Sequence, residues 1–311
     1  FASDALSSVA YAPQEIMMIL LLGGAAFLTF APWVAAAVVL LLVVVVLSYR
    51  QLIRAYPSGG GDYEVASKNL GEKAGVVVAA ALLVDYVLTV AVSVASGVDN
   101  IISALPALNA WRVELAIGFV ILIILMNLRG VREASSVFAV PTYVFIGSVV
   151  GLARTGLGDA PGASSADYTS QVHSLTNAAV VLLVLRAFSS GCSALTGVEA
   201  VSNGVQAFRR PKIRNAQTTL AIMGTIAGCL FAGLVALALI SGIHYAENPC
   251  DLQGFDCTQP QPSLIAQLAA AVFGGGSIPF FFIQAATACV LLLAANTAFN
   301  GFPVLGSILA K

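Results

Sequence analysis

Long uninterrupted runs of apolar residues dominate the chain and predict helices that cross a membrane. The stretches Ile16–Tyr49, Gln217–Ile243 and Leu264–Ala310 hold no charged residue, and about 20 apolar residues span a bilayer as a helix. A transmembrane β-barrel would instead show segments of about ten residues with alternating polarity, so the continuous runs favour helices. Eight spans are predicted, over 5–28, 33–54, 75–103, 113–128, 137–155, 177–206, 217–242 and 278–308. A shorter apolar segment, 263–273, is expected to lie flat before the last span, with a bend at Gly274–Gly276.

Two of these spans carry polar interruptions that predict broken helices. Span one opens with Ser3-Asp4-Ala5-Leu6-Ser7-Ser8, and span six holds Ser189-Ser190-Gly191-Cys192-Ser193, which leads into Thr196-Gly197-Val198-Glu199. Such clusters of Ser and Gly permit an unwound stretch whose backbone carbonyl groups can coordinate ions. Interrupted helices at corresponding places in two halves of a chain are typical of a transporter's binding site. If the repeat is five helices long, span six is the counterpart of span one.

The composition excludes a water-soluble fold. The chain has 311 residues, of which 59% are hydrophobic and 9% are charged, and its mean hydropathy is +0.94. A soluble domain holds about 25% charged residues, so lipid must be the solvent here. The formal net charge of −1 says little by itself, but the distribution of the charges is informative.

Lysine and arginine residues gather on one side of the predicted membrane. If the spans alternate in direction, the basic residues on that side are Arg50, Arg54, Lys68, Lys73, Arg129, Arg132, Arg209, Arg210, Lys212, Arg214 and Lys311. The other side holds only Arg112 and Arg154, together with several acids. Because cytoplasmic loops carry an excess of basic residues, this pattern predicts a multi-pass protein of the cell (plasma) membrane with a cytoplasmic N-terminus.

The chain ends and the cysteines add two further expectations. The chain opens at Phe1 without an initiator Met and closes at Lys311 directly after a span, so we expect a fragment of a longer transporter, truncated at both ends. Cys250 and Cys257 lie in a polar, proline-rich loop on the outer side. An oxidising compartment would permit a disulfide between them, but spacing alone does not fix the geometry, and the sequence leaves the pairing open.

Acidic residues inside the spans are the strongest indication of function. Asp4, Asp85 and Glu199 lie in or against apolar runs, each beside Tyr, Thr or Ser. Ionised carboxylates are costly in hydrocarbon, so they usually face a bundle interior, a water-filled cavity or an ion path. Asp62 and Glu64, in contrast, lie in a predicted cytoplasmic loop, where we expect them to be solvated rather than functional.

Helical spacing is expected to place hydroxyl groups beside these acids. The pairs and triplets that would share a helix face are Asp4 with Tyr11, Asp85 with Thr89, Tyr86 with Thr89 and Ser93, and Thr196 with Glu199 and Asn203. A dehydrated potassium ion is satisfied by several oxygens of moderate field strength, such as carbonyls and hydroxyls. Any one Ser or Thr could instead bond its own helix backbone. A carboxyl group in a low-dielectric site can hold a proton, so Glu199, or Asp85 in its place, is a candidate proton carrier.

The motifs around these residues resemble the amino acid–polyamine–cation (APC) superfamily. Within it, Ser3–Tyr11, Asp85–Thr89 followed by Ser93, and Ala194–Ala200 are similar to the first, third and sixth helices of the KimA-type potassium/proton symporters of the KUP group. The segments Asn127–Ala134, Phe208–Pro211 and Asn296–Phe299 also fit the superfamily. The resemblance implies an all-α integral membrane protein of the LeuT-type fold, with five-helix inverted repeats. This chain would hold about helices one to eight of twelve in a single transporter domain over residues 1–311, with the first repeat at 1–155 and an incomplete second repeat at 177–311.

The resemblance also implies roles for individual residues. Potassium would be lined by Asp4, Tyr11, Asp85, Tyr86, Thr89, Ser93 and Thr196, and Glu199 would couple transport to the proton. Potassium and the proton would be transported species rather than cofactors. The partners would be the lipid bilayer and the transported potassium ion or amino acid, with no nucleic acid. Potassium transporters of this group often form dimers, so a homodimer is one option.

Other functions stay open. Amino-acid transporters of the superfamily usually carry a Gly-rich break in helix one that receives the substrate carboxylate, whereas Ala5-Leu6-Ser7-Ser8 stands here behind an acid. That acid attracts a cation and repels a carboxylate, which favours potassium over the alternative of a proton-coupled amino acid or polyamine permease. A passive cation channel or a transport-dead sensor is the alternative from another class. The sequence offers no nucleophile beside a base and no metal or phosphate motif, so we do not expect an enzyme.

Overall fold

Helices form all the regular elements in the described part of the computed structural model, which comprises residues 2–57, 59, 61–128, 135–159, 176–252, 255–256 and 258–309. The α-helices are α1 (Ala2–Ser7), α2 (Ala12–Leu21), α3 (Ala31–Ala55), α4 (Gly61–Leu70), α5 (Glu72–Ala104), α6 (Arg112–Leu128), α7 (Ser135–Asp159), α8 (Asn177–Gly191), α9 (Glu199–Asn203), α10 (Lys212–Ile240), α11 (Leu264–Phe273) and α12 (Ile278–Leu309). Short 3-10 helices connect several of them: η1 (Ser8–Ala10), η2 (Ala25–Phe30), η3 (Pro106–Trp111), η4 (Cys192–Leu195), η5 (Val205–Ala207) and η6 (Pro249–Asp251).

Seven helical stretches among the described residues are long and apolar enough to cross a membrane. They correspond to predicted spans two to eight and cover Ala25–Ala55, Glu72–Ala104, Pro106–Leu128, Ala139–Leu157, Asn177–Asn203, Lys212–Ile240 and Ile278–Pro303. The first predicted span, 5–28, is instead divided into α1, η1 and α2, which ends at Leu21. A new helix then begins at Ala31, where Pro32 fits the first turn because its missing N–H would have no partner there.

A helix that the sequence interpretation missed lies between spans two and three. The predicted cytoplasmic loop contains α4, which packs against the start of α5. Asp62 and Glu64 lie in its first turn and Lys68 in its last, which is the favourable arrangement for the helix dipole. Glu64 and Lys68 also form an ion pair of 2.5 Å. Because α4 is short and polar, no search for apolar spans detects it.

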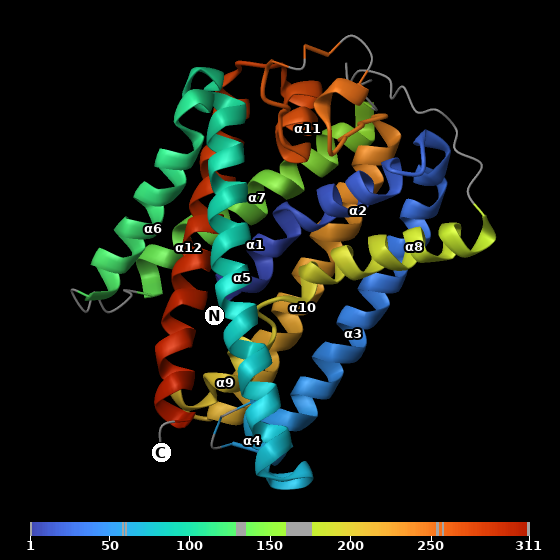
Figure 1. Ribbon diagram of the computed structural model, residues 1–311. Helices are drawn as coiled ribbons and strands as arrows, with labels where there is room; N and C mark the ends of the chain where they lie inside the picture. The colour runs from blue at the N-terminus through green and yellow to red at the C-terminus, as the bar shows by residue number, and fades with distance from the viewer. Residues whose placement is uncertain are drawn as a thin grey trace.

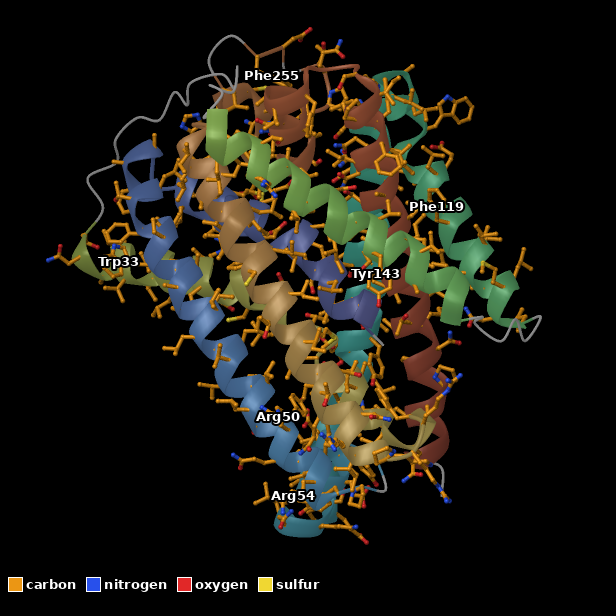
Figure 2. All side chains as sticks on the ribbon, turned by 180° about the vertical axis from the view of Figure 1, so that it is seen from behind. Trp33, Arg50, Arg54, Phe119, Tyr143 and Phe255 are labelled. Atoms are coloured by element: carbon orange, nitrogen blue, oxygen red, sulfur yellow. The ribbon has the colours of Figure 1, made fainter. Side chains whose placement is uncertain are left out.

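The helices form an elongated bundle with α4 at one end and α11 at the other (Figure 1). We call these the α4 end and the α11 end. Figure 2 shows Arg50 and Arg54 near the α4 end and Phe255 at the α11 end. The short helix α1 lies near the centre of the bundle, where it contacts α12, α10 and α7 (Figure 1). Its central place puts the first acidic motif of the chain at mid-height of the bundle.

Apolar side chains fill the interior and also cover the outer surface. Phe145, Phe231 and Leu234 are fully buried, whereas Leu40 on α3 and Val84 on α5 are 66% and 58% exposed. Since lipid tails are as apolar as the core, hydrophobicity does not decide which helices meet, and small residues that let helices approach closely take over that role. Gly224 of α10 is such a residue, because it lies directly against Val46 of α3.

Two sequence expectations fall partly outside the described residues. Cys250 is disulfide-bonded, but Cys257 lies outside the described residues, so the pairing of the two stays a prediction. Cys192, Cys229 and Cys289 are free. Of the basic residues counted on the inner side of the membrane, Arg129, Arg132 and Lys311 also lie outside the described residues.

The close contact between α3 and α10 gives a test of the packing. We expect Gly224→Ala to destabilise the protein by about 1–3 kcal/mol, the usual cost of overpacking. The added Cβ would lie 2.6 Å from Cγ2 of Val46, and a β-branched side chain in a helix has no second favourable rotamer. Gly118→Ala on α6 is the matched control, because nothing lies within 4 Å of its Cβ. Thermal unfolding in detergent compares the two, and equal melting temperatures would contradict the close contact.

Candidate functional site

The two broken helices meet inside the bundle. Residues Ser8–Tyr11 separate α1 from α2, and η4 with Thr196–Val198 separates α8 from α9. The hydroxyl of Ser8 donates to the backbone carbonyl of Thr196 at 3.4 Å, across 188 residues of sequence. Thr196 has an extended backbone, with φ −59° and ψ 138°, so its carbonyl is not committed to a continuous helix. The sequence therefore predicted both interruptions, and the structure brings them into contact.

Gly197 lets the second break approach the first acidic residue of the chain. Its φ of +85° is a conformation that favours glycine. A Cβ at this position would lie 2.7 Å from Cγ of Asp4 and 2.8 Å from the backbone nitrogen of Ala5. The backbone of the second break is thus pressed against the side chain of Asp4, and only a residue without a side chain fits between them.

The three intramembrane acids gather at this meeting point. Asp4 interacts electrostatically with Asp85 of α5, and Glu199 of α9 interacts with both. Asp4 is only 5% exposed, and Asp85 and Glu199 are partly buried. Within the described part of the chain, the charged side chains that act on Asp4 and Glu199 are all carboxylates. Like charges in a poorly solvated site repel, so the three acids favour the binding of a cation or a proton.

The side chains of two tyrosines, which carry hydroxyl groups, lie near the acids. Tyr11 and Tyr86 both interact electrostatically with Asp4 and Asp85. Tyr11 directly follows η1 at the first break and is only 5% exposed. The ring of Tyr86 lies against α12 at Gly301, where a Cβ would be 3.0 Å from its Cζ. Both tyrosines therefore lie within electrostatic reach of the acids, and their role as cation ligands stays a prediction.

Thr89 and Ser93 extend the polar face of α5 toward the α11 end. They follow Asp85 at intervals of four residues, so they lie on its side of the helix, one and two turns away. Thr89 is 5% exposed and Ser93 is fully buried. The hydroxyl of Ser93 has no hydrogen-bond partner among the described residues. A buried hydroxyl without a partner is free to bind a ligand.

Two expectations from helical spacing are wrong because the helices are interrupted. Asp4 and Tyr11 lie on opposite sides of η1, and Thr196 precedes α9 in an extended conformation. Asp4 and Tyr11 therefore do not share a face of one continuous helix, and neither do Thr196 and Glu199. Of Thr196, Glu199 and Asn203, only Glu199 and Asn203 lie on the same helix, four residues apart.

The structure adds functional candidates that the sequence interpretation did not select. The hydroxyl of Tyr49 on α3 donates to Oδ2 of Asp62 at 2.7 Å, and both residues interact electrostatically with Glu199. Asp62 was expected to be solvated, but it is partly buried at the α4 end of the site. No local pattern indicates this pair, because its partners lie on either side of a run of helix-breaking residues.

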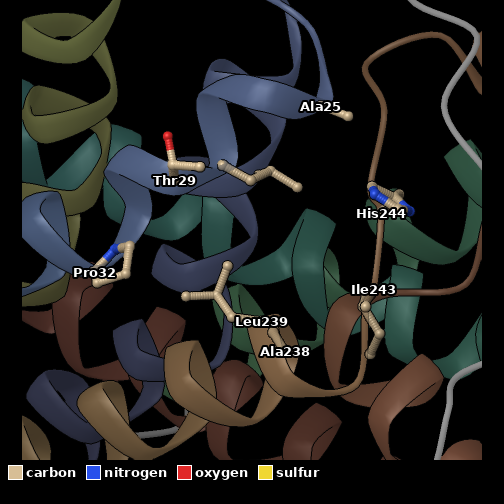
Figure 3. A pocket seen from close by; sticks show the side chains of 9 residues that line it. Ala25, Thr29, Pro32, Ala238, Leu239, Ile243 and His244 are labelled. Carbon is tan, nitrogen blue, oxygen red and sulfur yellow. The ribbon is translucent and has the colours of Figure 1, made fainter.

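A separate cavity of about 380 Å³ lies between η2 and the end of α10 (Figure 3). Its lining residues are Ala25, Leu28, Thr29, Pro32, Ala238, Leu239, Gly242, Ile243 and His244. The lining is mainly apolar and includes none of the intramembrane acids. Thr29 is its one side chain with an oxygen atom, which is fewer than a dehydrated cation requires, so the meeting point of the two breaks is the candidate site.

Comparison with known proteins places these features among membrane transporters. The amino acid permease family matches residues 3–310. Potassium transporter KimA from Bacillus subtilis (strain 168) is 44% identical over 317 residues, which is 100% of this chain and 49% of KimA. Low-affinity putrescine importer PlaP from Escherichia coli (strain K12) is 26% identical over 158 residues, 50% of this chain and 34% of PlaP. The chain thus spans about half the length of KimA. Together with the long apolar helices, these relatives indicate a multi-pass membrane protein.

The contact between Gly197 and Asp4 gives a test of the site. We expect Gly197→Ala to destabilise the protein more than Gly274→Ala does, by about 1–3 kcal/mol. Both glycines have φ +85°, but nothing lies within 4 Å of a Cβ at Gly274. The difference between the two melting temperatures therefore reports the contact with Asp4 rather than the backbone conformation. Equal melting temperatures would mean that the second break does not press against α1.

Proposed function

Because the chain belongs to the amino acid permease family, we propose that it is a secondary active transporter that takes up potassium together with a proton. The observation that carries the proposal is the convergence of Asp4, Asp85 and Glu199, whose carboxylates act on one another. The likeness to KimA, which is named as a potassium transporter, supports the choice of cation.

The ligands suit a monovalent cation that has lost its water. Asp4 and Asp85 supply negative charge, and the hydroxyls of Tyr11 and Tyr86 supply oxygens of moderate field strength beside them. Further ligands proposed from α5 and the second break are Thr89, Ser93 and Thr196. An amino acid would bring its own carboxylate next to Asp4, and the two negative charges would repel each other.

Glu199 is proposed to carry the coupled proton. It interacts electrostatically with Asp4 and Asp85 and also with Asp62 toward the α4 end. A proton on Glu199 and a potassium ion at Asp4 and Asp85 together balance much of the negative charge of the site. By charge alone each of these two positive charges weakens the binding of the other, so we place the coupling in the change of conformation: the site that holds both would bias the bundle of spans one and six to move against the remaining helices.

The proposed architecture is a LeuT-type fold in which the broken helices belong to different inverted repeats. The first repeat would cover 1–155 and the incomplete second repeat 177–311. The contact between η1 and η4 supports this arrangement, because each repeat then contributes one break to the site. The basic residues Arg50 and Arg54 near the α4 end support a cytoplasmic α4 end in the plasma membrane.

A polyamine permease is the second candidate. The match to PlaP, named as a putrescine importer, favours it. Carboxylates also bind the ammonium groups of a polyamine, so the acids by themselves do not separate the two cargoes. The likeness to KimA covers the whole chain, whereas the likeness to PlaP covers half of it, and potassium is therefore preferred.

Rubidium uptake into proteoliposomes tests the cation site. We expect Asp85→Asn to reduce the initial rate about tenfold or more, because an interaction with a charged group contributes about 1.5–3 kcal/mol. Glu114→Gln removes an exposed acid from α6 and serves as the control. Unlabelled potassium should compete with rubidium, and putrescine and amino acids should not. Unaltered uptake by Asp85→Asn would contradict the assignment of Asp85 to the cation site. Competition by putrescine would favour the polyamine permease.

The same vesicles test the role of Glu199. A glutamine at this position can neither bind nor release a proton in the functional range. We expect Glu199→Gln to take up rubidium at a rate that no longer responds to an imposed pH gradient, while the wild-type rate rises when the outside is acidic. A gradient response of the same size in both proteins would assign the proton to another group.

A further inference from the structure

The exposed face of α3 changes from apolar to basic near the α4 end. Leu40, Val43 and Leu47 are 66%, 49% and 49% exposed. Arg50 and Arg54 continue the same face of the helix at intervals of three and four residues, and both are exposed. Figure 2 shows the two arginines near the α4 end. Their guanidinium groups thus lie where the apolar surface of α3 stops, which is the level of the lipid headgroups in a bilayer.

Helix α10 lies beside α3 and runs in the opposite direction (Figure 2). A Cβ on Gly224 would lie 2.6 Å from Cγ2 of Val46. Closer to the α4 end, Nε2 of Gln217 donates to the backbone oxygen of Arg50 at 2.6 Å. Lower residue numbers on α10 therefore meet higher residue numbers on α3, and the first turns of α10 lie against the last turns of α3.

A third arginine belongs to the same end of this helix pair. Arg214 is exposed in the first turn of α10, three residues before Gln217. Since Gln217 contacts Arg50, Arg214 lies at the level of Arg54, one turn further toward the α4 end. Ile222, on the same side of α10 as Arg214, is 56% exposed. On both helices an exposed apolar surface therefore gives way to arginine at the same level.

The three arginines have no acidic partner within the described part of the chain. The ion pairs of that part join Lys68 to Glu64 and Arg112 to Asp99. Three neighbouring positive charges without a carboxylate repel one another, and an anion that lies between them removes this repulsion. The anion must also suit a position at the edge of an apolar surface.

We propose that Arg50, Arg54 and Arg214 bind the phosphate group of an anionic phospholipid whose acyl chains lie along the exposed faces of α3 and α10. A guanidinium group can hold a phosphate through two parallel N–H···O bonds. Basic side chains at a membrane surface attract anionic lipids, and basic pockets between membrane helices hold their headgroups. The inference goes beyond the proposed function and does not depend on which cargo is transported.

A phosphate held by both helices would tie the end of α3 to the start of α10. Both helices also contact α9, which follows the second break. The bound lipid is therefore expected to stabilise the α4 end of the bundle, next to the interrupted helix that contributes Glu199 to the candidate site.

Native mass spectrometry of the purified protein, titrated in detergent with dioleoyl phosphatidylglycerol or dioleoyl phosphatidylcholine, tests the site. We expect the wild type to bind phosphatidylglycerol in preference to phosphatidylcholine. Arg50→Gln, Arg54→Gln and Arg214→Gln should each weaken phosphatidylglycerol binding about fivefold, the effect of removing one cation near a membrane surface. Binding of phosphatidylcholine should not change. Equal binding of the two lipids by the wild type would overturn the proposal.

Lys73→Gln is the matched control. Lys73 is an exposed cation at the start of α5, and Val76 and Val77 beside it are 59% and 69% exposed. It therefore also lies at the edge of an apolar surface, but on neither α3 nor α10. We expect Lys73→Gln to bind phosphatidylglycerol like the wild type. A loss as large as in Arg50→Gln would mean that overall charge attracts the lipid, and the site would be wrong.

Two further measurements separate a lipid site from other roles of the arginines. All variants should melt like the wild type in phosphatidylcholine, and phosphatidylglycerol should stabilise the wild type more than the arginine variants. If the arginine variants lose the same stability in both lipids, the arginines serve the protein's own packing and the lipid site is wrong. Inorganic phosphate at the concentration of the lipid should not compete, because it has no acyl chains. Competition by phosphate would assign the arginines to a soluble anion instead.

Discussion

Carboxylates enclosed by membrane helices need a positive partner, and the centre of this protein is organised around that requirement. Asp4, Asp85 and Glu199 come from three different helices and act on one another. Their convergence depends on a backbone contact, because Gly197 has no side chain where the second break meets Asp4. A side chain at position 197 would push that break away from Asp4.

Interrupted helices solve a problem that continuous helices cannot. A continuous helix uses its backbone carbonyls internally, so it can offer only side chains to a ligand, whereas an extended residue such as Thr196 has a carbonyl to offer. An interruption also leaves backbone N–H and C=O groups without their helical partners, and these groups need other hydrogen-bond partners in a low-dielectric interior. Ser8 supplies one such partner, because its hydroxyl shares its hydrogen between the carbonyl oxygens of Ala5 and Thr196. It thereby joins the two breaks. Stability and ligand binding thus depend on the same few residues.

The spans and the chemistry of the site could be predicted from sequence, but the way in which the site is assembled could not. Run length matches bilayer thickness, so the span predicted at 113–128 is observed as Arg112–Leu128. The Ser and Gly clusters likewise marked both breaks. Spacing arguments for Asp4 with Tyr11 failed, since the helix between them is interrupted at η1. The contact between the two breaks, across 188 residues of sequence, has no local pattern that could predict it. Helix α4 and the hydrogen bond from Tyr49 to its Asp62 were missed, because a short polar helix has no hydropathy signal and the bond joins two separate helices.

The most direct test of this account is the position of a bound rubidium ion, located by its anomalous X-ray scattering in crystals of the protein. We predict one strong peak at the junction of the two breaks, within about 3 Å of oxygens from Asp4, Asp85 or Tyr86, the range for direct coordination of such an ion. A peak confined to the protein surface, or no peak at saturating rubidium, would contradict the claim that these acids converge to bind a dehydrated cation.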